Sequence, residues 1–547
     1  MQGVEGLEDV WEPVPTPPQA HKVRIDSTPH IASQYEVPGS SEHRSLHMQN
    51  RRTTRRIARL SRITNNDSRV CYTIYMPSIF GKFFESENTA EPAPKPFDAV
   101  YAEAAAAAAA LDFTSAVPLF DQAIALDPLH AEAYYKRGNA LKNLGRLDAA
   151  VASYDQAIEH KADHAYAYCN RGVVQQSLGL TAAALSSYDQ AIAYDPTDAM
   201  AHYNRALLLQ DCSRWNDAIV SYDRAIAIDP QFSDAQYNRA LTLLFLGDFE
   251  RGWRGYEWRW HNAQRLSIGA PRHFQQPLWL GEDSLEGKRL FLYSEAGLGD
   301  TLQFCRYATS AAALGATVLV EVQPPLVDLL SKLRGVSRVM AAGSISPSFD
   351  YQCPLMSLPL AFKTTLDRIP AAAKYLDSDQ IKVARWRTRL GTRKRPRIGL
   401  AWSGNPGNTI DRRRSIRLAD MAEHLPTEVE YFCLQKEVRR EDRATLDSNS
   451  RIFSFDDDSL DFANTAALCE CMDLVISVDT SIAHLSGALG RRTWLLLPQV
   501  PDWRWMRERE DSPWYLTMKL YRQKFAGNWN EVFARLGADL RREFEIG

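Results

Sequence analysis

The stretch LVISVDTSIAHLSGALGRRTWLLLP, residues 474–498, decides the fold of the C-terminal part of the chain. Residues 474–478 are apolar and β-branched, which predicts a buried parallel strand. Small polar residues of the helix-capping type follow at 479–481, and a helical pattern runs over 482–489. A second apolar strand is predicted over 493–497. Together these segments predict a strand–turn–helix–strand unit of an open parallel sheet.

The turn of this unit supplies groups suited to an anionic ligand. In open α/β sheets ligands bind at the carboxyl ends of strands, and the free N–H groups of helix N-termini attract phosphate. An anion or a nucleotide would then be surrounded by Asp479, Thr480, Ser481 and His484. The alternative is that the DTS turn only caps the helix and that His484 only packs within it.

Residues 97–266 repeat with a period of 34 residues. The aromatic position of the repeat is held by Phe120, Tyr154, Tyr188, Tyr222 and Tyr256. Small alanines recur at the same interval and allow paired helices to approach closely. A 34-residue period with these features is the signature of the tetratricopeptide repeat. We therefore predict an α-solenoid of about five units, the last of which has Arg259 where the others have alanine.

Polar pairs in three successive units give a binding hypothesis for the solenoid. The pairs are Asn170 and Arg171, Asn204 and Arg205, and Asn238 and Arg239. Such a ladder would grip the backbone of an extended peptide. The alternative is that these side chains stabilise neighbouring units or face water. In both cases the repeats are expected to bind a protein partner rather than to carry chemistry.

A second strand–turn–helix unit lies upstream of the opening stretch. Residues 288–294 are predicted to form a strand, and a glycine-containing turn leads to one helix over 301–314. Asp300 stands at the start of that helix, where its charge either serves chemistry or only stabilises the helix dipole. Further strands of this half are predicted over 317–322 and 349–355.

A third unit begins near Arg397, with a strand predicted over 398–402 and a glycine-rich turn behind it. Arginines follow this turn, and a lysine follows the next predicted strand. Guanidinium groups match phosphate oxygens in bidentate geometry, so these residues are candidates for holding a diphosphate. The candidates are Ser403, Gly404, Asn405, Arg412, Arg414 and Lys436. The alternative is a solvated basic loop.

The three units together resemble the glycosyltransferase family 9 (heptosyltransferase-like) enzymes, and most of all the subgroup fused to tetratricopeptide repeats. The resemblance covers roughly residues 100–525 and rests on SEAGLGDTLQFCRYA, WSGNPGNTIDRRRSI, DTSIAHLSGALG and WLLLPQVPDWRW. It implies a GT-B fold of two Rossmann-like domains facing each other across a cleft, which we place at 286–390 and 395–547. It also implies that the C-terminal helix crosses back to the first half.

The resemblance implies an inverting, metal-independent glycosyltransferase of hexosyl or heptosyl type. The donor would be a nucleotide sugar, the acceptor a glycan or a protein, and no further cofactor would be needed. Asp300 corresponds to the family's proposed catalytic aspartate and would be the general base. The family usually has histidine where this chain has Asn408. One alternative is a tetratricopeptide scaffold whose transferase domain is inactive. The small size of the first Rossmann-like half supports this alternative. Another is a protein O-GlcNAc-type transferase.

Tryptophans mark the junction between the repeats and the next domain. They are Trp253, Trp258, Trp260 and Trp279. Such a cluster is predicted to pack the two domains together, with a sugar-stacking platform as the alternative. In the PDWRW segment, Trp503 and Trp505 would either cover the donor or pack on the repeats.

Composition narrows the class of protein. The net charge of −3 gives no argument for nucleic-acid binding, and the longest apolar runs fall short of the ~20 residues of a membrane span. The eight cysteines lack the spacing of a zinc site. We expect a cytoplasmic protein without bound metal. Residues 1–96 are expected to be a disordered or non-native extension, with Met48 and Met76 as alternative starts.

Overall fold

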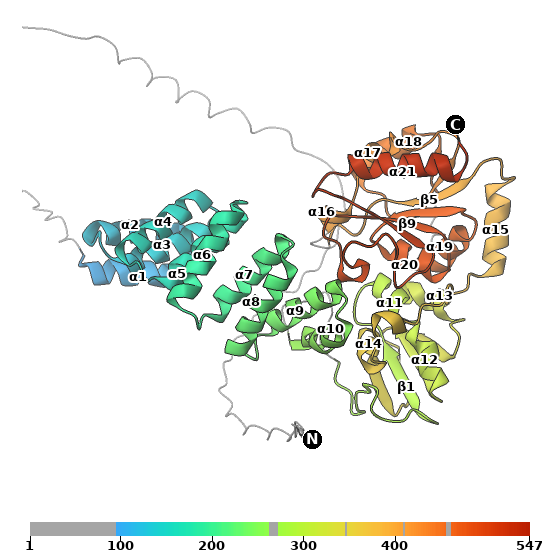
Figure 1. Cartoon of the computed structure of the whole chain (residues 1–547), viewed down its shortest axis with the longest axis horizontal. Coiled ribbons are helices and arrows are strands. Elements are labelled where there is room, and N and C mark those ends of the chain that lie inside the picture. The colour runs from blue at the N-terminus through green and yellow to red at the C-terminus, as the bar shows by residue number, and fades with distance from the viewer. Residues whose placement is uncertain (1–94, 262–271, 345–346, 408–410, 456–460, 547) are drawn as a thin grey trace, which may run out of the picture. The chain divides into compact units, whose positions relative to one another are not determined.

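The computed structural model describes residues 95–261, 272–344, 347–407, 411–455 and 461–546 (Figure 1). Residues 1–94 of the predicted extension and Asn408 lie outside the described residues. Among the helices that the structure describes, none has both the length and the apolar character needed to cross a bilayer.

Helices α1 to α10 form five helix pairs that follow the predicted 34-residue period (Figure 1). Small residues at the contacts explain the pairing: a Cβ built on Gly138 would lie 2.6 Å from the ring of Tyr154, and one on Gly172 would lie 2.7 Å from Tyr188. The helices are α1 (Phe97–Ala109), α2 (Phe113–Leu126), α3 (Ala131–Asn143), α4 (Leu147–His160), α5 (Ala165–Ser177), α6 (Thr181–Tyr194), α7 (Ala199–Asp211), α8 (Trp215–Ile228), α9 (Ser233–Leu246) and α10 (Phe249–Tyr256), followed by η1 (Glu257–His261).

The first sheet has four parallel strands in the order β3-β2-β1-β4. The strands are β1 (Arg289–Tyr293), β2 (Thr317–Val322), β3 (Val336–Ala341) and β4 (Tyr351–Pro354). The helical segments are α11 (Leu298–Phe304), α12 (Tyr307–Ala313), η2 (Pro324–Leu326), α13 (Val327–Leu330), η3 (Leu355–Ser357), α14 (Leu358–Ala361) and η4 (Leu366–Arg368). Residues of α11 to α14 pack on one face, whereas Phe274 and Phe349 cover the other face at Phe291.

The single helix predicted over 301–314 is wrong, because the structure has α11 and α12 with a break between them. The side chain of Arg306 donates from Nε to the carbonyl of Gln303 at 2.7 Å. That carbonyl would otherwise accept the i+4 amide of a continuous helix. The break therefore follows from a side-chain hydrogen bond that the helical pattern does not reveal.

The second sheet has six parallel strands in the order β10-β9-β8-β5-β6-β7, and α15 (Gln380–Leu390) precedes it. The strands are β5 (Arg397–Ala401), β6 (Glu430–Cys433), β7 (Ile452–Phe453), β8 (Leu474–Val478), β9 (Thr493–Leu497) and β10 (Met518–Arg522). The helical segments are α16 (Asp411–Arg414), α17 (Leu418–Ala422), α18 (Arg440–Ser448), α19 (Phe462–Cys469), α20 (Ser481–Ala488), η5 (Trp503–Trp505) and α21 (Asn530–Glu543).

Helices cover both faces of this second sheet. On β8, Val475 packs with α19 and α20, and its neighbours Leu474 and Ile476 pack with α17 and α21. The opening stretch of the sequence analysis thus forms β8, α20 and β9, with Gly490 left-handed at φ +68° after the helix, as predicted. The described contacts of α21 stay within this half, so the implied crossing to the first half is wrong.

The predicted tryptophan junction is confirmed for Trp253. Its ring lies 5.2 Å from Trp503 and 6.3 Å from Trp514, and its Nε1 donates to the carbonyl of Thr364 at 3.0 Å. Trp503 is buried in this contact, which agrees with packing on the repeats rather than with covering a donor. The end of the repeats is therefore tied to both halves of the α/β region.

Candidate functional site

Strand order places the candidate residues at two crevices. In each sheet the order in which strands are added reverses at the first strand. This switch point lies between β1 and β4 in the first sheet and between β5 and β8 in the second. In open α/β sheets the loops at the carboxyl ends of the strands diverge at such a point and form the usual ligand crevice. The turn 295–297 follows β1 and leads into α11, while the turns 402–405 and 479–481 follow β5 and β8.

The turn after β5 is held by Gln435 at the end of β6. Its Oε1 accepts from the amide of Ser403 at 2.9 Å, and its Nε2 donates to the Ser403 hydroxyl at 3.0 Å. A Cβ on Gly404 would lie 2.5 Å from the carboxylate of Asp411, so a larger residue at this position would displace that carboxylate. The side chain of Asn405 accepts from the amide of Gly407 and forms a local turn.

One of the predicted arginines joins the two turns of this crevice. Arg414 donates from Nη1 to the carbonyl of Asp479 at 2.6 Å and lies 3.4 Å from the buried carboxylate of Asp411. Arg439 also pairs with Asp411 and donates to the Gly404 carbonyl at 3.2 Å. The structure thus brings Arg414 to the site but leaves Arg412 and Lys436 exposed to solvent.

The start of α20 carries the predicted DTS turn. Thr480 occupies the N-cap position with an extended backbone, and its hydroxyl lies 3.3 Å from that of Ser477 rather than capping the helix. Thr480 and Ser481 are both partly exposed. Thr480 is thus the N-cap residue, but its side chain makes no capping hydrogen bond. The hydroxyls and the N-terminal end of α20 remain accessible for an anion.

His484 is a buried residue at the centre of this arrangement. Its Nδ1 lies 2.8 Å from the Tyr515 hydroxyl and its Nε2 3.9 Å from Asp479. Burial, together with the charges of Arg504, Arg306 and Arg414, holds the pKa of His484 well below its usual range. Burial also raises the pKa of Asp479. An uncharged imidazole can donate a hydrogen bond without adding charge.

The two crevices meet at Asp300. One carboxylate oxygen accepts from the Gly297 amide at 2.9 Å, and the other pairs with Arg504 from the second half. The Asp300 side chain keeps 25% of its surface exposed, so it can still be reached. A Cβ on Gly299 would lie only 2.8 Å from the His484 ring, so glycine here permits the close approach of the halves.

Sequence reasoning missed three arginines of this site. Arg504 pairs with Asp300 and Asp502, and its Nε donates to Gln303 at 2.6 Å. The buried Arg306 donates to backbone carbonyls, including that of Trp514 at 2.7 Å. Arg439 is the third. Arg306 lies inside the SEAGLGDTLQFCRYA motif and Arg504 inside the PDWRW motif. Neither motif reveals these contacts, because the partners lie far away in sequence.

The Asn–Arg pairs of the repeats make contacts between neighbouring units. Arg171 on α5 pairs with Asp155 on α4 at 2.6 Å and donates to Ser187 on α6 at 3.1 Å. Arg205 and Arg239 repeat the ion pair one and two units later. These contacts are those of the alternative in which the pairs stabilise the solenoid. Peptide gripping by the pairs stays a prediction.

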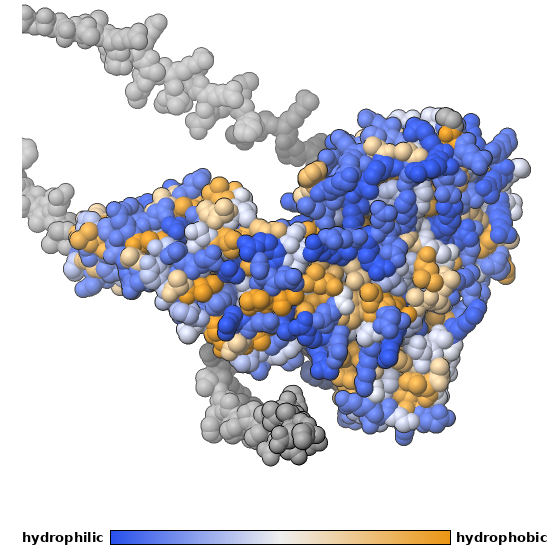
Figure 2. Space-filling view, in the orientation of Figure 1, coloured by the Kyte–Doolittle hydropathy of each residue, from blue (hydrophilic) through white to orange (hydrophobic). Residues whose placement is uncertain are grey.

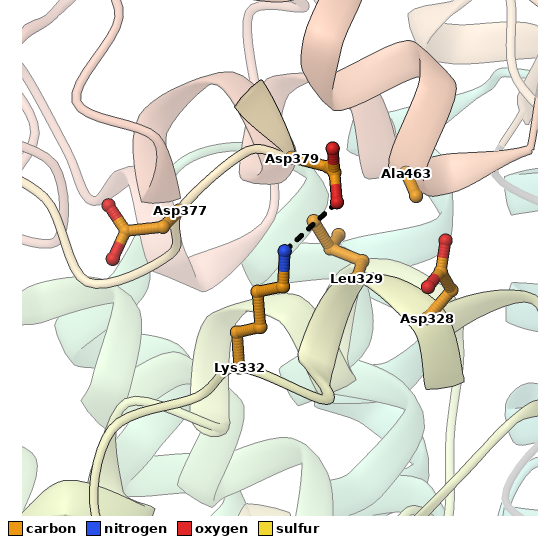
Figure 3. A pocket seen from close by; sticks show the side chains of 6 residues that line it. All are labelled: Asp328, Leu329, Lys332, Asp377, Asp379 and Ala463. Atoms are coloured by element: carbon orange, nitrogen blue, oxygen red, sulfur yellow. Dashed lines mark hydrogen bonds and ion pairs between the residues drawn. The ribbon is translucent and has the colours of Figure 1, made fainter. Parts of the chain in front are cut away.

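The pocket drawn in Figure 3 lies apart from the two crevices. Its volume is about 10 Å³, which is roughly room for one water. It is lined by Asp328, Leu329, Lys332, Asp377, Asp379 and Ala463. Lys332 closes it with an ion pair to Asp379 at 2.9 Å. A ligand of nucleotide size does not fit there.

Fold and contacts define a tetratricopeptide-repeat protein whose solenoid precedes an α/β region with two parallel sheets. Family profiles support the first part. Two profiles are described as "Tetratricopeptide repeat": one matches residues 119–152, 187–220 and 221–254, and the other matches 165–198. A third, described as "TPR repeat", matches 138–179. Tetratricopeptide repeats over 119–254 are therefore confirmed.

Similar proteins match only part of this chain. Protein FlbA of Caulobacter vibrioides is 28% identical over 327 residues, which is 55% of this chain and 53% of that protein. The chain thus spans about half the length of this curated relative. Among solved structures, MamA is 22% identical to this chain, with a TM-score of 0.27. The match covers 28% of this chain and 91% of the MamA chain. The type IV pilus biogenesis factor PilW is 24% identical, with a TM-score of 0.28. That match covers 31% of this chain and 79% of the PilW chain. TM-scores this low decide nothing about the present chain.

Proposed function

We propose that this protein is a glycosyltransferase of the GT-B type, which moves a sugar from a nucleotide-sugar donor to a glycan or protein acceptor. The observation that carries the proposal is the contact between the two crevices, where Arg504 pairs with Asp300 and Gly299 lies against His484. A transferase with two substrates needs a donor site and an acceptor site that face each other at the reacting atoms. The sequence motifs of both turns favour the same activity.

The donor diphosphate would lie at the crevice between β5 and β8. Arg414 and the N-terminus of α20 would offset its negative charge, and the hydroxyls of Thr480 and Ser481 would donate to its oxygens. This charge grows as the bond from the sugar to the diphosphate breaks, so donors fixed in place lower the barrier. The proposed donor site therefore needs no metal ion.

The acceptor would lie on the side of β1 and β4. Its hydroxyl oxygen attacks C1 of the sugar, its proton passes to Asp300, and the nucleoside diphosphate leaves from the opposite face, with inversion at C1. Arg504 would release one oxygen of Asp300 for this step while Asp502 and Gln303 keep holding the guanidinium. The electron pair of the broken C1–O bond would stay on the leaving diphosphate, and the acceptor proton would end on the Asp300 carboxylate.

A donor screen tests this activity. Thermal shift with ADP-, GDP-, UDP- and dTDP-sugars should raise the melting temperature for one nucleotide class, since a ligand at 100 times its Kd stabilises the folded state by ~2.7 kcal/mol. A response to UDP-N-acetylglucosamine together with transfer to a protein would favour the O-GlcNAc-type alternative. The absence of any shift across the panel would favour the inactive scaffold.

Removing two hydroxyls of the DTS turn should weaken nucleotide binding. For Thr480→Ala with Ser481→Ala we expect a loss of ~1–3 kcal/mol in the binding free energy, the range for hydrogen bonds to a charged group. Isothermal titration with the nucleotide selected by the screen measures it. Thr517→Ala, which removes a hydroxyl bonded to the Arg491 carbonyl, is the control. Equal affinities for the wild type and the double variant would refute the diphosphate site.

We further propose that the repeats dock the acceptor or another protein. Exposed apolar side chains support this, because they interrupt the polar surface of the repeats (Figure 2). They include Tyr166, Met200 and Val220, exposed by 57%, 49% and 60%. Tetratricopeptide solenoids present extended surfaces of this kind to partner proteins.

Variants of two asparagines in the ladder distinguish a role in peptide binding from a role in solenoid stability. Asn170 donates to the Tyr135 hydroxyl at 3.1 Å and to Asn139 at 3.0 Å, whereas the described contact of Asn204 is a weak one to the Cys169 sulfur at 3.7 Å. Asn170→Ala should therefore cost ~1 kcal/mol of stability and Asn204→Ala a few tenths. If the ladder grips peptides, Asn204→Ala should nevertheless reduce selection from a displayed dodecapeptide library. Unchanged selection would leave these residues with a structural role only.

A further inference from the structure

The last repeat sends a buried arginine into the first half of the α/β region. Arg259 lies in η1, directly after α10, and its side chain is fully buried. In the four preceding units the equivalent position, 34 residues apart each time, is an alanine. A guanidinium is much larger than a methyl group and must be paired when it is buried. The change in residue type therefore marks a contact that the other units do not make.

Arg259 reaches the crevice between β1 and β4. It pairs with Glu295, in the turn after β1, at 2.8 Å, and donates to Ser357, at the end of η3 after β4, at 2.6 Å. Glu257 closes the cluster by pairing with Arg259 at 2.6 Å and accepting from Ser357 at 2.9 Å. A residue of the repeats thus occupies part of the crevice where an open α/β sheet binds its ligand.

Glu295 depends on this arginine. Its side chain is 2% exposed, and in the described part of the chain its Oε2 has no hydrogen-bond partner. Burial raises the pKa of Glu295 to about 7, and the charge of Arg259 opposes that shift. The other charged or titratable groups around Glu295 are Glu257, Asp300, Tyr293 and Cys353. Without Arg259 the carboxylate would be a buried charge with no counter-ion.

Glu295 lies in the turn that leads into α11, and Asp300 lies in the first turn of that helix. The carboxylate of Asp300 folds back onto the amide of Gly297, and the carbonyl of Ala296 accepts from Gln323 at 2.7 Å. The position of the Asp300 carboxylate therefore depends on the position of the backbone at residues 295–297. The ion pair with Arg259 fixes the first residue of that segment.

We propose that Arg259 is a positioning residue of the transferase, which through its ion pair with Glu295 holds the turn leading into the start of α11, where Asp300 lies. This inference rests on the proposed function. It makes the last tetratricopeptide unit a built-in part of the acceptor side rather than a detachable docking arm. A misplacement of a reacting group by ~1 Å costs up to ~10²-fold in rate, so a loose turn should be felt in turnover.

Arg259→Lys tests the proposal, because lysine keeps the charge but loses the fork in which Nη2 contacts Glu295 and Ser357 while Nη1 contacts Glu257. We expect kcat to fall by ~10–100-fold while the donor KM and the affinity for the nucleoside diphosphate stay unchanged. Amide hydrogen exchange at residues 295–301 should become faster. Arg251→Lys is the matched control, since Arg251 lies in the same unit but is 57% exposed in a surface pair with Asp248.

The double variant Arg259→Met with Glu295→Gln covers the case that Arg259→Lys does not fold. It removes both charges at similar volume, and it should show the same loss of turnover and the same faster exchange. A folded variant with wild-type kcat and unchanged exchange at 295–301 would overturn the proposal. The exchange measurement needs no sugar transfer. If the wild type transfers no sugar, the proposed function fails, whereas the exchange result still decides whether Arg259 orders the turn.

Discussion

Replacing Asp300 with asparagine should lower the transfer rate by ~10²–10⁴-fold, the typical contribution of a general base. The amide oxygen can still accept from the Gly297 amide, so the start of α11 should keep its geometry. The negative charge that would take the acceptor proton is lost. Melting temperature, donor affinity and transfer rate measured on one preparation should show an intact fold and an intact donor site with little turnover.

The ion pair with Arg504 supplies the control for this experiment. Arg504 lies between Asp300 and Asp502, and each of these aspartates has 25% of its side chain exposed. Asp502→Asn removes the other carboxylate from the same guanidinium but leaves Asp300 charged. If Asp300 is the base, Asp502→Asn should keep turnover within about tenfold of the wild type. Equal losses in both variants would mean that Asp300 acts only as a counter-ion.

A helix-dipole role for Asp300 predicts a different outcome. A carboxylate in the first turn of a helix contributes only ~0.3–1 kcal/mol to stability. Asp300→Asn would then lower the melting temperature slightly and leave turnover near normal. A rate within a few-fold of the wild type would exclude the base assignment.

Replacing Trp253 with alanine should destabilise the protein by ~3–5 kcal/mol, the range for a buried large aromatic side chain. Trp253 is 2% exposed and packs on Phe304 of the first half and on Trp503 and Trp514 of the second. Its Nε1 also donates to the Thr364 carbonyl, which would lose its partner. We expect a lower urea midpoint for the transition that tryptophan fluorescence follows.

Tyr166→Ala is the matched control, since Tyr166 is an aromatic residue of the repeats with 57% of its surface exposed. It should change stability by less than ~0.5 kcal/mol. A loss below ~1 kcal/mol for Trp253→Ala would contradict the view that the last repeat and the two halves share one core. In that case the aromatic junction would be a loose contact.

The order of secondary structure could largely be predicted from the chain alone. Period and strand pattern are local properties: small residues at 34-residue intervals define the helix pairs, and apolar runs define strands such as β8 that are buried on both faces. The strands β3, β7 and β10 were not predicted. They lie at sheet edges, where charged residues such as Arg338 and Lys519 interrupt the apolar run.

The candidate site could be predicted only in part. Sequence reasoning identified the turns at the carboxyl ends of β1, β5 and β8, because small residues, glycines and an aspartate mark them. It could not tell that Arg414 crosses to the Asp479 carbonyl while Arg412 stays in solvent, because both look alike in the DRRRS segment. The geometry of α16 decides which arginine faces inward, because it places Arg414 beside the buried carboxylate of Asp411.

Contacts between distant segments were decided by the tertiary structure alone. Arg504 meets Asp300 across 204 residues, and Arg259 meets Ser357 across 98. A buried charge must lie beside a counter-charge. The packing of the sheets and of the last repeat decides which counter-charges are near. The sequence by itself therefore determined the repeats, the interior strands and the turns between them. Only the packed chain determined which charges meet at those turns, because the low polarity of the interior rewards pairing in space whatever the separation in sequence.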